Sequence, residues 1–203
     1  MSLSENLRDE MFSGTKKVAE NLKIEASKLQ PWIDAHVPGA GAIKKIEQFK
    51  GGQSNPTYKI TTEGKDLVLR RKPPGKLLQS AHAVDREYKV ITALYETDVP
   101  VPKTYGLCED DDVAGTAFFV MDCLDGNIFW DPMIPSISKE DRIKVYQNKN
   151  RTLAALHSVN YKKVGLEDYG KPNNYVARQI ERWSRQYRAC LLYTSPSPRD
   201  PIG

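Results

Sequence analysis

The sequence of 203 residues is poor in cysteine, with only Cys108, Cys123 and Cys190. Three widely separated cysteines fit neither a disulfide framework nor a zinc site, so we expect a reducing, intracellular compartment. No apolar run approaches the roughly 20 residues that a membrane-spanning helix requires. The N-terminus also lacks the apolar segment of a signal peptide, which argues against secretion.

A strong charge of one sign is missing as well. The formal net charge is +4 at pH 7, and the Lys and Arg residues are spread along the chain. A nucleic-acid-binding protein usually concentrates more positive charge on one surface, so we expect no nucleic-acid partner. The hydrophobic fraction of 39% and the charged fraction of 28% are typical of a globular protein.

The most informative stretch is a glycine-containing turn between two predicted strands. Gly51 and Gly52 allow a sharp turn and close approach to a ligand, and they are followed by Gln53, Ser54 and Asn55. Such a turn can lay backbone N–H groups over phosphate oxygens. It matches neither a P-loop nor a Gly-x-Gly-x-x-Gly motif, and taken alone an ordinary hairpin turn is an equal alternative.

Hydrophobic periodicity predicts five strands and several helices. The strands are expected at residues 43–49, 57–62, 66–71, 104–108 and 117–121. Helical spacing predicts one helix that ends before Pro38 with Pro31 in its first turn, and others over residues 80–96, 138–158 and 175–187. Ser138, with Asp141 three residues later, is expected to cap the third of these helices.

The third predicted strand and the helix that follows it carry opposite charges toward one interior. Val68 and Arg70 share a face of the strand, because side chains alternate with a period of two. Glu87 lies within the apolar stripe of the helix, where a carboxylate needs a partner. We therefore predict an ion pair between Arg70 and Glu87, with a solvated edge arginine and a solvent-reaching glutamate as the alternatives.

Two other features favour structural explanations. His157 near the end of the helix at 138–158 could act as a base, but no nucleophile supports that role, so a core or helix-end histidine is preferred. The acidic run at 109–112 lacks the spacing of an EF-hand loop, and a solvated turn is expected there.

Several segments together resemble the aminoglycoside phosphotransferase family, and within it the N-terminal kinase-like domain of acyl-CoA dehydrogenase family members 10 and 11. These segments are residues 51–58, 67–76, 86–88, 99–103, 118–122, 156–159 and 165–171. The resemblance covers about residues 29–189. It implies an α+β, protein-kinase-like fold, with an N-lobe of a five-stranded antiparallel sheet and a helix, followed by the first helices of the C-lobe.

The resemblance also implies ATP and Mg²⁺ as cofactors. Gly51 to Asn55 would cover the phosphates, while Arg70, held by Glu87, would contact the α- and β-phosphates. The hinge that offers backbone groups to adenine would comprise Asp122, Cys123 and Leu124. The acceptor would be a small-molecule hydroxyl, with a hydroxyacyl-CoA as the candidate, and the compartment would be peroxisomal or mitochondrial, although no targeting signal is readable.

The sequence departs from the family in one respect. The catalytic loop His-Gly-Asp with its following Asn is absent, and so is the later metal-binding Asp. We therefore assign no catalytic residue and no metal ligand, and expect this chain itself to transfer no phosphate. Three interpretations stay open: the N-terminal part of a phosphotransferase, a nucleotide-binding pseudokinase or regulatory module, and a protein whose natural form continues into an acyl-CoA dehydrogenase domain.

The domain organisation that we expect has four parts. Residues 1–23 form a flexible arm, 24–124 the N-lobe with its preceding helix, and 125–189 the hinge exit with a partial helical C-lobe. Residues 190–203 break the family pattern and look like a translated adapter sequence, and we expect this tail not to pack on the domain.

Overall fold

The computed structural model describes residues 11–51, 55–75, 82–170 and 173–191. The prediction for the tail therefore falls almost entirely outside the described residues. The chain divides into two compact units, residues 1–164 and residues 165–203. The first unit contains the sheet and helices α2 to α5, and the second contains α6.

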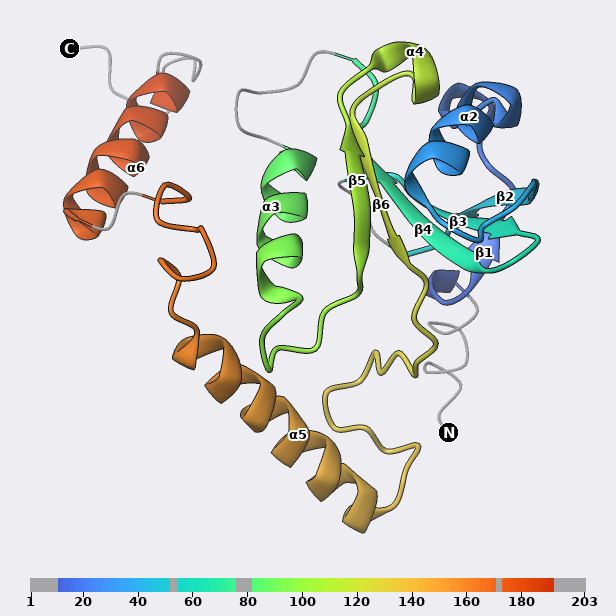
Figure 1. The fold of residues 1–203 in the computed structure, drawn as a ribbon. Helices are drawn as coiled ribbons and strands as arrows, with labels where there is room; N and C mark the ends of the chain where they lie inside the picture. The colour runs from blue at the N-terminus through green and yellow to red at the C-terminus, as the bar shows by residue number, and fades with distance from the viewer. Residues whose placement is uncertain (1–10, 52–54, 76–81, 171–172, 192–203) are drawn as a thin grey trace, which may run out of the picture. The chain divides into compact units, whose positions relative to one another are not determined.

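The centre of the first unit is an antiparallel sheet of six strands in the order β1-β2-β3-β4-β6-β5 (Figure 1). The strands are β1 Thr15–Lys16, β2 Ile43–Phe49, β3 Thr57–Thr62, β4 Asp66–Arg71, β5 Thr104–Cys108 and β6 Phe118–Asp122. The predicted α+β class and antiparallel sheet are confirmed. The sixth strand, β1, lies in the N-terminal arm that we expected to be flexible. It forms because the backbone of this segment pairs with Gln48 and Phe49 at the edge of β2.

The predicted helices are present, and two of them, α2 and α3, differ from the prediction near their starting points. They are α2 Ala26–His36, α3 Val84–Leu94, α4 Asp111–Ala114, α5 Lys139–Ser158 and α6 Tyr175–Leu191, with a 3-10 turn at Glu20–Leu22. Pro31 lies in the middle of α2 on an exposed surface, not in its first turn. The helix predicted from residue 80 begins at Val84, because His82 has a left-handed φ of 60°; residues 80–81 lie outside the described residues.

Two of the smaller predictions concern helix ends. The Ser138 hydroxyl accepts a hydrogen bond from the Asp141 N–H at 3.1 Å, so the predicted cap of α5 is confirmed. The acidic run contains the short helix α4 rather than a plain turn, since the Asp110 carboxylate caps it by accepting from the Asp112 N–H at 2.9 Å. Neither contact suggests a ligand.

The sheet separates two environments. Its hydrophobic core lies between the sheet and α2 (Figure 1). Leu67 and Leu69 of β4 face this core, whereas Val68 and Arg70 lie on the opposite face, as their alternation predicts. The fully buried core side chains include Leu29, Ile33, Tyr58, Ile60, Leu67, Leu69, Phe118 and Val120.

A buried cation fastens the segment before α2 to this core. Arg71 is only 4% exposed, and its guanidinium donates to the carbonyl oxygens of Ala114 and, at 3.0 Å, Leu22. Its Cζ lies 5.2 Å from the centre of the Tyr58 ring, whose hydroxyl also donates to Leu22. Burial raises the pKa of the Tyr58 phenol. Arg71 therefore joins β4, α4 and the N-terminal segment.

A second polar contact holds the far edge of the sheet. The Tyr105 hydroxyl of β5 donates to the Asp122 carboxylate of β6 at 2.6 Å. Burial and this negative acceptor raise the pKa of Tyr105 to about 12. The side chain of Asp122 consequently lies on the α2 side of the sheet, in line with its pairing partner Leu67.

Helices α5 and α6 expose apolar side chains. On α5, Ile143 is 49% and Leu153 is 51% exposed, and on α6, Ile180 and Trp183 are 62% and 66% exposed. No helix in the described part of the chain is both long enough and apolar enough to cross a membrane.

Arg71→Met should destabilise the fold by about 2–4 kcal/mol, because it leaves the buried Ala114 carbonyl without its donor. Urea denaturation of the full chain measures this loss in the free energy of unfolding. Arg142→Met is the control, since Arg142 also donates to a backbone carbonyl but is only partly buried, and its effect should stay within about 0.5 kcal/mol. Equal stability of Arg71→Met and wild type would contradict the role given to Arg71.

The raised pKa of Tyr105 predicts a loss of stability in alkali. The folded state keeps this phenol protonated up to a pH of about 12, whereas the unfolded chain releases the proton near its ordinary pKa of 10. The stabilisation is therefore complete below pH 10 and is lost as the pH rises from 10 to 12. Melting temperatures measured across this range should fall less steeply for Tyr105→Phe than for wild type, while the exposed Tyr161→Phe should keep the wild-type slope.

Candidate functional site

The candidate site lies on the face of the sheet opposite α2. Thr57 of β3, Arg70 of β4 and Phe119 of β6 are neighbours across three adjacent strands. Helix α3 packs on β5 and β6 at this face, and the rings of Tyr88 and Phe119 lie 6.0 Å apart. The helix thereby brings Glu87, one residue before Tyr88, beside Arg70.

The predicted ion pair between Arg70 and Glu87 is present. Arg70 Nε donates to Glu87 Oε2, and Arg70 Nη2 donates to Glu87 Oε1 at 3.3 Å. The two side chains are 29% and 36% exposed, so both the solvated-arginine and the solvent-reaching-glutamate alternatives are excluded. The pair is two-pronged and leaves one side of the guanidinium near solvent.

Thr57 accepts a third hydrogen bond from the Arg70 guanidinium. Arg70 Nη1 donates to Thr57 Oγ1 at 3.0 Å, and the Thr57 hydroxyl donates in turn to the carbonyl of Asn55 at 3.1 Å. Our sequence reasoning overlooked Thr57, although its position opposite Arg70 follows from the register of the predicted hairpin. Described residues thus occupy three of the five guanidinium N–H bonds of Arg70.

Asn55 lies deeper than its place in a surface turn would suggest, with only 4% exposure. Its Nδ2 donates to Glu87 Oε1 at 3.1 Å, and its Oδ1 lies 2.9 Å from His82 Nδ1. The side chain therefore reaches toward α3 rather than outward from the turn. No signal in the sequence singled out His82, which comes close only because of the chain path before α3.

Gly51 is the only residue of the turn's 51–54 portion that the structure describes; Gly52, Gln53 and Ser54 lie outside the described residues. A Cβ at Gly51 would come within 3.1 Å of the Phe12 carbonyl oxygen and 3.8 Å of the Trp130 ring. Trp130 donates through Nε1 to Ser13 Oγ at 2.9 Å and packs on Phe12 with ring centres 5.3 Å apart. Two segments distant in sequence therefore border the start of the turn.

The predicted hinge begins at the end of β6. Asp122 is the last residue of this strand and still pairs with Leu67, so the strand extends one residue beyond the predicted end at 121. Its carboxylate accepts from Tyr105 and its N–H donates to the Lys103 carbonyl at 2.9 Å. Cys123 donates weakly through its N–H to the Asp66 carbonyl at 3.4 Å, and Leu124 is 66% exposed.

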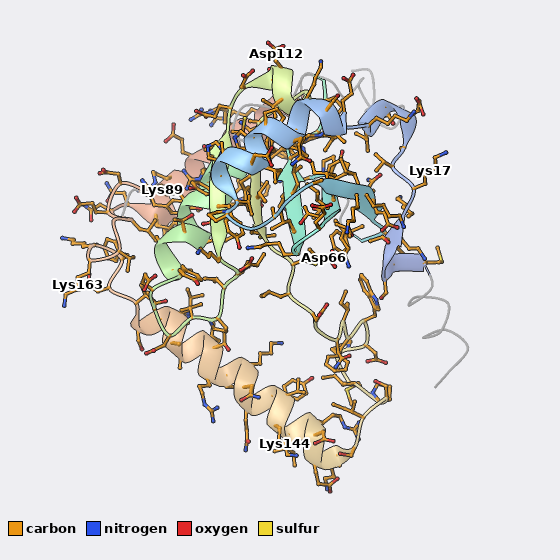
Figure 2. All side chains as sticks on the ribbon, turned by 45° about the vertical axis from the view of Figure 1, so that its right-hand side comes forward. Lys17, Asp66, Lys89, Asp112, Lys144 and Lys163 are labelled. Carbon is orange, nitrogen blue, oxygen red and sulfur yellow. The ribbon has the colours of Figure 1, made fainter. Side chains whose placement is uncertain are left out.

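The charged side chains next to the predicted hinge pair with one another. Figure 2 shows Asp66 at the end of the sheet, where its carboxylate pairs with Lys59 Nζ at 2.7 Å. The ammonium lowers the pKa of Asp66, and burial raises the pKa of the nearby Cys123 thiol. Within the described residues, no group of three His, Cys, Asp or Glu side chains could hold a metal ion. His157 lies exposed in the last turn of α5.

Curated relatives are longer proteins of which this chain spans a part. "Probable acyl-CoA dehydrogenase IBR3" of Arabidopsis thaliana is 52% identical over 162 residues, which are 77% of this chain and 20% of that protein. The human "Acyl-CoA dehydrogenase family member 11" is 40% identical over 192 residues, 91% of this chain and 25% of that protein. Family member 10 of Mus musculus is 42% identical over 185 residues, 90% of this chain and 17% of that protein.

A solved structure shares the fold. A protein from Ralstonia eutropha, whose crystal structure is described as that of an aminoglycoside phosphotransferase, matches with a TM-score of 0.70 and 46% sequence identity. The match covers 82% of this chain and 48% of the solved chain. The kinase-like fold expected from the sequence is thereby confirmed.

The family itself follows from a profile that extends over most of the chain. The phosphotransferase enzyme family matches residues 45–199, a range that contains the glycine turn, Arg70, Glu87 and the hinge. The relatives also bear out the resemblance to acyl-CoA dehydrogenase family members 10 and 11. This kinase-like chain therefore belongs to the phosphotransferase enzyme family.

Proposed function

We propose that this chain is the nucleotide-binding part of an ATP-dependent phosphotransferase that acts on a small-molecule hydroxyl. The observation that carries the proposal is the two-pronged hold of Glu87 on Arg70 next to a glycine turn. A guanidinium held in this way presents its remaining N–H bonds in a fixed direction. Phosphate is the ligand class that such a planar, permanently charged donor binds best.

The geometry at Arg70 fits a polyphosphate. Among the described residues, Glu87 and Thr57 take three of its five N–H bonds, and the other two would bind phosphate oxygens. Because the side chain keeps 29% of its surface exposed, an anion can reach it. ATP would supply the γ-phosphoryl group for transfer, and Arg70 would hold the α- and β-phosphates in place.

The other assigned residues take supporting roles. Gly51, Gly52, Gln53 and Ser54 would cover the phosphates with backbone N–H groups. Adenine would lie against Val68 and hydrogen-bond to the backbone of the hinge at Asp122, Cys123 and Leu124. Val68 suits this contact, because it lies on the Arg70 face of β4.

The proposed acceptor is the hydroxyl of a hydroxyacyl-CoA. Support comes from the relatives that are named as acyl-CoA dehydrogenases, of which the chain spans only 17–25%. A dehydrogenase domain in the same polypeptide would then act on the acyl-CoA that is made from the phosphorylated hydroxyacyl-CoA. Mg²⁺ would be needed for transfer, but the described residues offer no carboxylate cluster for it.

Binding of ATP by the full 203-residue chain should depend on Arg70. Isothermal titration with ATP is expected to give an affinity that falls about 10- to 100-fold in Arg70→Gln, because two charge-assisted hydrogen bonds are lost. Binding of adenosine should be unchanged, since it has no phosphate. Arg142→Gln in α5 provides the charge-matched control, and an equal loss of ATP affinity in that variant would contradict a specific role of Arg70.

Phosphate transfer by this chain alone should be undetectable. Release of ADP, measured with Mg²⁺-ATP and a hydroxyacyl-CoA, should equal that of buffer, because the 203 residues contain no His-Gly-Asp loop and the described ones offer no carboxylate cluster for the metal. Turnover that disappears in Arg70→Gln would show instead that the chain carries its own catalytic groups.

A further inference from the structure

The hydrogen bonds around Arg70 form a closed circuit. Arg70 donates to Glu87 and to Thr57, and Thr57 donates to the carbonyl of Asn55. The circuit closes through the Asn55 side chain, whose Nδ2 donates to Glu87 at 3.1 Å. Each donor in the circuit has one acceptor, so the four residues hold one another in a single arrangement.

The donor and acceptor assignments follow from chemistry. A carboxylate can only accept, so Asn55 must present its NH₂ group to Glu87 and its oxygen to His82. His82 Nδ1, 2.9 Å from that oxygen, therefore carries the proton. Glu87 and His82 thus hold the two ends of the amide in one orientation, and Asn55 is almost wholly withdrawn from water at 4% exposure.

The position of Asn55 in the chain gives the circuit a consequence. Asn55 follows the glycine turn at 51–54 and lies two residues before the start of β3, whereas Glu87 belongs to α3. Glu87 Oε1 accepts from both Asn55 and Arg70. Loss of the Asn55 side chain would therefore remove one of the two donors that hold the carboxylate beside the guanidinium.

We propose that Asn55, held by His82, is a positioning residue that orients the Glu87 carboxylate and, through it, the Arg70 guanidinium. This inference rests on the proposed nucleotide site and deepens it. With Asn55 in place, Glu87 keeps the Arg70 guanidinium in the orientation in which it would bind phosphates. Asn55 contacts no phosphate through its side chain in this arrangement, because both ends of its amide are already bound.

The test compares ATP with adenosine in the full chain. Asn55→Ala should lower the affinity for ATP about tenfold and leave that for adenosine unchanged, because only phosphate binding depends on the aim of Arg70. Thr62→Val is the matched control: Thr62 is also a buried polar residue at 5% exposure, but its bonds to Lys65 lie at the other end of β3. It should keep the wild-type ratio of the two affinities.

A double-mutant cycle separates positioning from direct contact. If Asn55 acts through Glu87, the variant Asn55→Ala with Glu87→Gln should bind ATP no more weakly than Glu87→Gln alone. Additive losses would overturn the proposal, and so would a wild-type ratio of ATP to adenosine affinity in Asn55→Ala. His82→Asn, which tolerates the left-handed φ of 60°, should reproduce part of the Asn55→Ala effect.

A measurement without nucleotide separates the failure of the proposed nucleotide binding from the failure of the positioning role of Asn55. In ¹⁵N NMR spectra of the free chain, the Arg70 Nε–H should exchange with solvent several times faster in Asn55→Ala than in wild type or Thr62→Val. An unchanged exchange rate would overturn the coupling. Should the wild-type chain bind neither ATP nor adenosine, the proposed function fails, while faster exchange in Asn55→Ala would still support the circuit.

Discussion

The ion pair between Arg70 and Glu87 is the contact on which the arrangement of the site depends. It joins the central strand β4 to α3 and orients the cation that faces the glycine turn. Both side chains keep about a third of their surface exposed, so water weakens their attraction and the pair contributes more to geometry than to stability. The pair sets the orientation of the Arg70 guanidinium, because the Glu87 carboxylate occupies one edge of this planar group.

Two consecutive arginines on β4 serve different purposes because a strand alternates. Arg70 lies on the site face, where it keeps contact with solvent and with Glu87. Arg71 lies on the core face, where carbonyl groups from two other segments and the Tyr58 ring surround its charge. The same residue type is therefore a partly exposed cation, which we propose binds phosphate, at one position and a buried structural crosslink at the next.

The site could be predicted in outline and not in its finer contacts. Alternation placed Arg70 on the inner face, and helical periodicity placed Glu87 on the apolar stripe, so their pairing followed from two local patterns. Asn55 was assigned to the turn, but its bond to Glu87 spans 32 residues and has no local signature. His82 was missed for the same reason. The predicted end of the last strand, at residue 121, was one residue short, because Asp122 still pairs with Leu67.

The sequence by itself determined the α+β class, the five longer strands, the cap of α5 and the opposite faces of β4. These features depend on alternation, helical spacing and capping, which act within a few residues. Only the tertiary structure decided that the N-terminal segment adds a sixth strand, that Arg71 is buried, and that Asn55 closes a circuit through Thr57, Arg70 and Glu87. Those contacts join segments that meet only after the chain has folded, so their partners are set by packing and by the need of buried polar groups for hydrogen bonds.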